Sequence, residues 1–416
     1  DPYEALSWGS QSSQSAPWDF PSGDEGKPNP NQDESLSKDR DAWAKTDYVK
    51  GVAVVAVSRE DMEAFGLSGA GSSGITINGG VTTDVSTSDT SAYIGAGAKV
   101  NQNNANAAAD QSVLVAAGTD YHKMAIAGSI GLSGSFSAGA GVDVEVLYRH
   151  TSAHIDDSAM VNARRDVSVV AMANEDILSI SATIQGSLTV GVGGAVSVIV
   201  LDSHTSAYIG AATVFAGGNV LVWSMDTTDI DLIAGGIGLG FGGGGAGTSV
   251  GVNVINKTTE AYISDLATVD ARGNTSASMP TLNGGGPIKG LAVQAFSSED
   301  ILLVAANISG GLYVGIAGAV SVNYIDSETL AYIGAGAKIN MTDGNQGAAD
   351  AQSVDVAARN EVDIFVVDAG GGIGAAGIGG AVDVGTLRND TTAYIGNAAM
   401  VAAKGDVRVD AHSETE

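Results

Sequence analysis

The stretch TSAYIGAATVFAGGNVLVWS, residues 205–224, contains the two elements that recur along this 416-residue chain. Its Ala-Tyr-Ile triplet, or a close copy, appears six times, with the alanine at Ala92, Ala153, Ala207, Ala261, Ala331 and Ala393. Its alternating apolar segment, Val-x-Val or a close copy, appears seven times, starting at Val52, Val113, Val167, Val220, Leu291, Val354 and Val407. Self-similarity of this kind indicates a repeat architecture.

The spacing between the two elements is nearly constant in one direction only. From each of the first six starts to the following triplet the distance is 39 to 41 residues, whereas from a triplet to the next start it ranges from 13 to 30. The variation in length therefore lies in one segment of the unit, which holds polar or Gly-rich inserts at 101–111, 271–289 and 340–352. In a stacked array we expect these inserts on the same edge.

Residues 49–416 are interpreted as six units, each about 53 residues long plus inserts, and a partial seventh. The seventh stops at Glu416, inside its second predicted strand. Because terminal repeats usually cap an array, we expect either a segment of a longer repetitive protein or an open unit that another chain completes.

Each unit is predicted to consist of β-strands. Thr205, Ala207 and Ile209 share one face of a strand, with Ser206 and Tyr208 on the other, as period 2 requires. Short strands repeated in fixed register predict an all-β fold, a β-solenoid similar to a parallel β-helix, with two or three coils of about 18–27 residues per unit. A string of small antiparallel sandwiches is the alternative fold.

The Gly-rich apolar runs have a structural interpretation. Glycine makes up 58 of the 416 residues, and small side chains allow two sheets to approach closely. Residues 232–256 and 308–325 are nearly free of charge, but the run recurs in every unit, so we interpret it as a recurrent buried strand pair and expect no membrane insertion.

Charge and composition exclude several classes of protein. The chain has 47 acidic and 19 basic residues, a net charge of −28, which argues against binding nucleic acid or anionic membranes through charge. It has no cysteine, so neither a disulfide framework nor a thiolate metal site is available. A hydrophobic content of 44% argues against a disordered chain.

The first column of candidate functional residues is acidic. Nine residues after each start stand Asp61, His122, Asp176, Asp229, Asp300 and Asp363, with Glu416 in the partial unit. Stacked like charges repel unless water or a cation lies between them, so a Ca²⁺ ladder on the five aspartates is one hypothesis and a solvated corner is the other. The sequence has neither a Gly-Gly-x-Gly-x-Asp nonapeptide nor an EF-hand loop, which weakens the calcium hypothesis.

The second column is aromatic. It consists of Tyr93, Tyr208, Tyr262, Tyr332 and Tyr394, with His154 in the remaining unit. If the flanking alanine and isoleucine point inward, these rings point outward and either stack on sugars, form a lateral contact or shield one another.

Residues 1–48 differ from the repeats. They hold five of the seven prolines and three of the four tryptophans, Trp8, Trp18 and Trp43. We interpret this segment as an extended arm, either a disordered linker or a clasp whose tryptophans lie on a groove of a neighbouring subunit.

Catalytic patterns find little support. The five histidines show no zinc-ligand spacing, and no nucleophile elbow or phosphate-binding loop with lysine is present. We therefore predict that the protein is not an enzyme; a polysaccharide-acting enzyme is the weaker alternative.

The motif Ala-Tyr-Ile-Gly, then Gly-x-Val-x-Val, then a Gly-rich run ending Gly-Gly-Ala-Val-x-Val resembles the repeats of large secreted filamentous adhesins, including the fusobacterial leukotoxin type. Here it stands at residues 207–210, 219–222 and 193–198. The resemblance covers residues 49–416 and implies export, an extracellular or cell-surface location and a β-solenoid scaffold.

Uniform repetition predicts a structural and adhesive protein that polymerises head-to-tail, because an exposed strand edge is a template for another chain. A glycan- or receptor-binding segment that contacts a host or matrix surface is the alternative. No cofactor is expected other than the Ca²⁺ of the acidic column.

Overall fold

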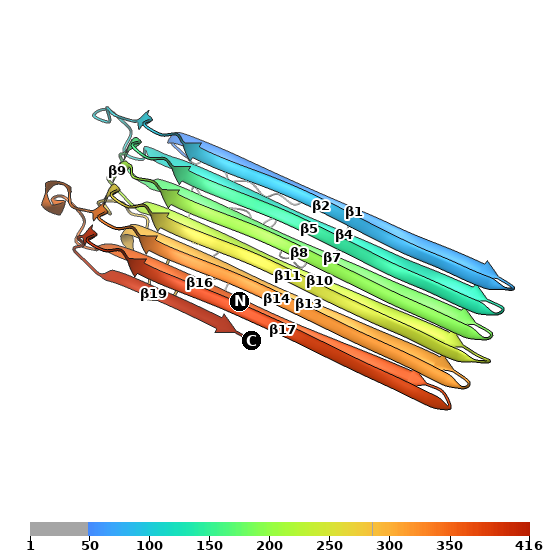
Figure 1. The fold of residues 1–416 in the computed structure, drawn as a ribbon. Coiled ribbons are helices and arrows are strands. Elements are labelled where there is room, and N and C mark those ends of the chain that lie inside the picture. The colour runs from blue at the N-terminus through green and yellow to red at the C-terminus, as the bar shows by residue number, and fades with distance from the viewer. Residues whose placement is uncertain (1–48, 285) are drawn as a thin grey trace.

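The computed structural model describes residues 49–284 and 286–416, and each repeat unit in it forms one coil of a parallel β-solenoid (Figure 1). A coil consists of a long strand, a tight turn, a second long strand that runs back, and a short third strand before the connecting loop. In the third coil these strands are β7 (Val167–Ser187), β8 (Val190–Ile209) and β9 (Thr213–Ala216).

Equivalent strands of successive coils pair in parallel to form three sheets, named A, B and C here. Sheet A contains, in order, β1 (Gly51–Ser72), β4 (Ser112–Ser133), β7, β10 (Val220–Gly240), β13 (Lys289–Gly311), β16 (Gln352–Ile373) and β19 (Val407–Thr415). Sheet B contains β2 (Ile75–Ile94), β5 (Phe136–Ile155), β8, β11 (Gly244–Ile263), β14 (Val314–Ile333) and β17 (Ala376–Ile395). Sheet C contains β3 (Lys99–Val100), β6 (Met160–Ala163), β9, β12 (Thr268–Ala271), β15 (Lys338–Ile339) and β18 (Met400–Val401), and the 3-10 turn η2 (Thr342–Asn345) follows β15.

The predicted all-β solenoid is confirmed, and the alternative of antiparallel sandwiches is wrong because all three sheets are parallel. The expected two or three coils per unit is also wrong, since each unit makes one. The Gly-rich run contains the tight turn, which is residues 188–189 in the third coil, and the strands extend into the run from both sides, so β7 reaches 21 residues and β8 reaches 20. Strands of ordinary length are about 5–6 residues long.

The register follows the repeat. The seven starts, Val52, Val113, Val167, Val220, Leu291, Val354 and Val407, are successive Cα partners in sheet A. The three inserts lie between a strand of sheet C and the next strand of sheet A, so they gather at the loop end of the coils, opposite the tight turns, as expected (Figure 1).

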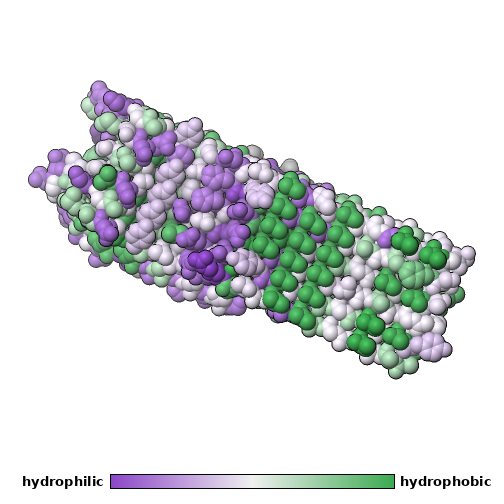
Figure 2. Space-filling view, viewed as in Figure 1, coloured by the Kyte–Doolittle hydropathy of each residue, from purple (hydrophilic) through white to green (hydrophobic). Residues whose placement is uncertain are grey.

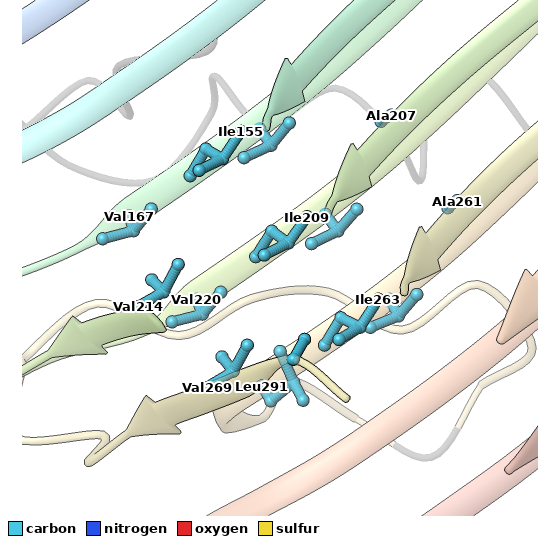
Figure 3. Close-up of a cluster of buried hydrophobic side chains, with 14 of the residues drawn as sticks. Ile155, Val167, Ala207, Ile209, Val214, Val220, Ala261, Ile263, Val269 and Leu291 are labelled. Atoms are coloured by element: carbon cyan, nitrogen blue, oxygen red, sulfur yellow. The ribbon is translucent and has the colours of Figure 1, made fainter. Parts of the chain in front are cut away.

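The larger apolar core cluster lies at the loop end, where all three sheets meet, and a second, which includes Ile199 and Ile230, lies between sheets A and B. Each coil contributes the same set of side chains, so that Ile209 packs with Val214 and Val220 while Ile263 packs with Val269 and Leu291 one coil further on (Figure 3). Their side chains are fully buried. No single coil can bury this set, because its partners lie in the coils above and below.

Towards the tight turns the two long sheets lie almost backbone to backbone. A Cβ atom added to Gly238 would lie 2.3 Å from the carbonyl oxygen of Ala246, and one added to Gly245 would lie 2.2 Å from that of Gly238. This confirms that the Gly-rich run lets two sheets approach closely. The interpretation of the run as buried is only half right, because alternate residues such as Val250 and Val252 point outward.

No helix among the described residues has the length and apolar character needed to cross a bilayer.

Candidate functional site

The acidic column forms as the spacing predicts, on the outer face of sheet A. Asp61, His122, Asp176, Asp229, Asp300 and Asp363 are successive Cα partners. At its first end Asp61 accepts a hydrogen bond from Arg59 at 3.0 Å, and His122 Nδ1 lies 3.1 Å from Asp176 Oδ2. Within residues 49–284 and 286–416 no three His, Cys, Asp or Glu side chains gather closely enough to hold a metal ion. The calcium ladder stays a prediction.

The middle of this column is electrostatically strained. Partial burial, together with the charges of Asp176, Asp231 and Asp300, raises the pKa of Asp229 to about 7. Burial and the charge of Asp363 likewise raise the pKa of Asp300. Asp229 and Asp300 therefore release their protons at a higher pH than water-exposed aspartates do.

Asp229→Asn is expected to stabilise the protein at pH 8 and to leave its stability at pH 4 unchanged. An unfolded aspartate ionises near pH 3.8, whereas the folded Asp229 ionises near pH 7, so rising pH costs stability across that window and the full cost is present above it. The shift sets an upper limit of about 4 kcal/mol, and solvent screening makes about 1–2 kcal/mol the expected gain. Thermal unfolding at both pH values measures it, with the exposed Asp202→Asn as control; equal gains at pH 4 and pH 8 would contradict the assignment.

The aromatic column is a continuous stack on the outer face of sheet B. Tyr93, His154, Tyr208, Tyr262, Tyr332 and Tyr394 follow one another with ring centroids 4.6–5.1 Å apart and planes within 4° of parallel. The ring faces therefore cover one another, and among the described residues no ring stacks on the outer faces of Tyr93 and Tyr394. A ligand of this column would meet ring edges and hydroxyl groups rather than ring faces.

A buried charge cluster lies between sheets A and B, and the sequence analysis did not identify it. Lys257 of β11 places its Nζ 2.9 Å from Asp226 Oδ1 and 3.3 Å from Glu299 Oε1, with all three side chains fully buried. The Lys257 ammonium also donates to Thr228 and to the Ser298 carbonyl oxygen. The cluster joins β11 of one sheet to β10 and β13 of the other.

The protonation of this cluster follows from its composition. Burial and the neighbouring Asp226 raise the pKa of Glu175 well above its ordinary value. Burial alone would lower the pKa of Lys257, but the charges of Asp226, Glu299 and Glu175 outweigh it and keep the pKa above its ordinary value. The cluster is thus one ammonium ion shared by three carboxyl groups.

A second buried cluster lies in the first two coils. Lys123 Nζ contacts Glu145 Oε1 at 2.6 Å and Asp84 Oδ2 at 3.1 Å, and Arg149 Nη1 donates to Glu60 Oε2 at 2.9 Å. Burial raises the pKa of Glu145 to about 7 despite the Lys123 charge. Both clusters bind sheet A to sheet B, and their lysines, Lys257 and Lys123, are fully buried, which makes them structural ties rather than an open site.

A flat apolar surface covers the middle of sheet B on its outer side; we call it the valine face (Figure 2). It consists of three adjacent columns of Cα partners: Val81, Val142, Val196, Val250, Val320 and Val382; Thr83, Val144, Val198, Val252, Val322 and Val384; and Val85, Val146, Val200, Val254, Tyr324 and Thr386. None of its valines is buried.

The inserts are the places where the repeat is broken. Arg272, after β12, and Asp343, in η2, lie 3.8 Å apart and line a shallow depression with Gln346 and Gly347. Residues 274–284 and 286–288 fold back over sheet A, where Met279 and Leu282 pack on Trp223 and Phe296.

Trp8, Trp18 and Trp43 of the predicted clasp lie outside the described residues.

Comparison with known proteins finds no matching family model, no matching curated protein and no matching solved structure. The predicted relation to filamentous adhesins therefore stays a prediction.

Proposed function

We propose that the chain is a non-enzymatic structural protein, secreted to a bacterial cell surface, whose coils continue head-to-tail into a filament. One observation supports it above all. The same residue positions pair in every coil, and within the described residues the outer edges of β1, β2 and β17 have no neighbouring strand. In sheet B the two edge strands, β2 and β17, each have 20 residues, so β2 of a second copy placed on β17 meets a ladder of the same length.

The test is electron microscopy of the purified chain at rising concentration, combined with a proline block on β17. Gly380 and Gly385 both have open space where a Cβ would lie. Successive N–H groups of a strand point to alternate neighbours, so one of these two positions donates towards β14 and the other towards the free edge. Proline removes the donor and is tolerated only on the free side.

Filaments are expected from the unmodified chain. Of Gly380→Pro and Gly385→Pro, the variant that keeps the circular dichroism of the parent is expected to form only short particles. Long filaments from both variants, or none from the unmodified chain at any concentration, would contradict head-to-tail growth. Comparing calcium with a chelator in the same series tests the acidic column.

Adhesion to glycans or to a host or matrix surface is the second candidate function, and the tyrosine column favours it. Tyr93 and Tyr394 are 53% and 40% exposed, and the rings between them present their edges to solvent. The consecutive tyrosines from Tyr208 to Tyr394 present a regularly spaced row of hydroxyl groups, which suits an extended polar ligand laid along the coils.

A further inference from the structure

We propose that two copies of this chain pair side by side through their valine faces, independently of any head-to-tail growth. The face holds fifteen valines, two threonines and one tyrosine in three unbroken columns. Its members at the edge coils are strongly exposed, for example Val85 at 72% and Val81 at 60%. A soluble protein rarely leaves a contiguous apolar surface of this kind uncovered.

The side of the valine face towards the tight turns has a shape that fits a second copy. The next column along sheet B consists of small residues: Gly79, Ala140, Gly194, Thr248, Gly318 and Gly380. It forms a trough beside the ridge made by Val196 and its partners. Beyond the trough the columns of Val190 and Val192 are again mostly apolar.

A two-fold axis parallel to the stack of coils, midway between the ridge and the trough, gives both copies the same contact. It sets the ridge of each copy over the trough of the other and keeps coil facing coil, because both copies have the same strand spacing. The long strands run side by side with little fanning (Figure 1), so the fit extends over the whole stack.

The area is sufficient for a stable dimer. The six columns from Val190 to Val200 span roughly 40 Å along the strands, and six strands span roughly 29 Å across them. The contact then buries on the order of 2,300 Å² in total, above the roughly 1,600 Å² of a standard specific interface. The hydrophilic columns that follow, headed by Asp202 and His204, fall outside the overlap and stay in solvent.

Charge favours another copy of the chain over a lipid surface as the occupant. The columns that border the valine face on its polar side carry Asp202, Asp326, Glu328 and Asp390 against Arg388. Anionic lipid would be repelled by this border and by the net charge of −28. Between two copies the repelling charges lie outside the apolar contact. Salt screens this repulsion, so added salt should strengthen the pairing.

Sedimentation velocity of the 416-residue chain, below the concentration at which filaments form, tests the pairing. The unmodified chain is expected to be a dimer that tightens with salt. Val250→Lys with Val252→Lys places two charges in the overlap, and its dissociation constant is expected to rise at least a hundredfold. Asn256→Lys with Thr258→Lys is the matched control, because it puts the same two charges on the same strand outside the overlap.

A monomeric parent chain, or a valine variant that dimerises as well as the control, overturns the proposal. Binding of a monomeric parent to neutral phosphatidylcholine vesicles would assign the face to lipid instead. Failure of the proline-block experiment leaves this result untouched, because the pairing uses outward side chains of sheet B, whereas head-to-tail growth uses the backbone N–H and C=O groups at the edges of the sheet.

The register has its own test, because the chain contains no cysteine. The proposed axis places Gly194 of one copy over Val196 of the other. An equimolar mixture of Gly194→Cys and Val196→Cys chains is expected to form disulfide-linked dimers under mild oxidation much faster than either variant alone. Equal rates in the three samples would overturn the ridge-on-trough arrangement.

Discussion

Lys257→Met is expected to lower the free energy of unfolding by about 3–5 kcal/mol, which is the usual cost of removing one partner from a buried ion pair. The substitution keeps much of the side-chain volume but leaves Asp226, Glu299 and Glu175 around an empty charge site. Hydrogen exchange is the measurement of choice, since long repeat arrays need not unfold in one step. Exchange should accelerate most in β10, β11 and β13.

Lys338→Met is the control, because Lys338 is an exposed lysine at the start of β15 and its loss should change stability by less than about 0.5 kcal/mol. Adding Asp226→Asn and Glu299→Gln to Lys257→Met should recover part of the lost protection, because neutral amides need no counter-ion. Unchanged exchange in Lys257→Met would show that the cluster does not tie the sheets together.

Gly238→Val is expected to destabilise the chain by about 3 kcal/mol or more, or to prevent folding, because overpacking against backbone leaves no side chain that can yield. The added Cβ would lie 2.3 Å from the carbonyl oxygen of Ala246 and 3.1 Å from that of Gly191, so the two long sheets would have to separate. Thermal unfolding and the yield of soluble protein report the effect.

Gly235→Val is the matched control on the same strand. Gly235 faces outward, and the nearest atom to an added Cβ, the carbonyl oxygen of Ala306, lies at 3.7 Å. Valine suits a strand better than glycine does, so this variant should be neutral or more stable by up to about 1 kcal/mol. Equal effects of the two substitutions would show that the sheets do not meet as closely as described.

Local alternation in the sequence predicted which side chains point inward, and did so reliably near the triplet. Ala207 and Ile209 are buried and Tyr208 faces outward, because a strand has period 2 whatever its partners are. The ladders followed from the constant spacing for the same reason. The number of coils per unit did not follow, because alternation continues through glycine and valine without marking where a strand ends.

The buried charges and the valine face were missed for related reasons. Lys257 lies four residues before the inward-facing Ala261, so its direction could have been read from period 2, but lysine is rarely expected inside a protein. The run at 232–256 was interpreted as a buried strand pair, although its Val250 and Val252 lie on the outer face. The odd or even position of each residue along its strand predicted the correct face. The usual location of valine in the core and of lysine on the surface suggested the wrong one.

The 20-residue strands limit how far the protein extends for each residue added. Each unit of about 53 residues lengthens the stack of coils by only about 4.8 Å. The width of the stack stays at the roughly 70 Å that one long strand spans. A fold of this kind is a poor choice for carrying a tip far from a cell, since a conventional helix gains about 1.5 Å for every residue. Each added unit instead enlarges the two outer faces, by one long strand in sheet A and one in sheet B. Additional units in one chain would therefore enlarge a flat wall, and head-to-tail joining of copies would continue that wall into a broad ribbon rather than a thin rod.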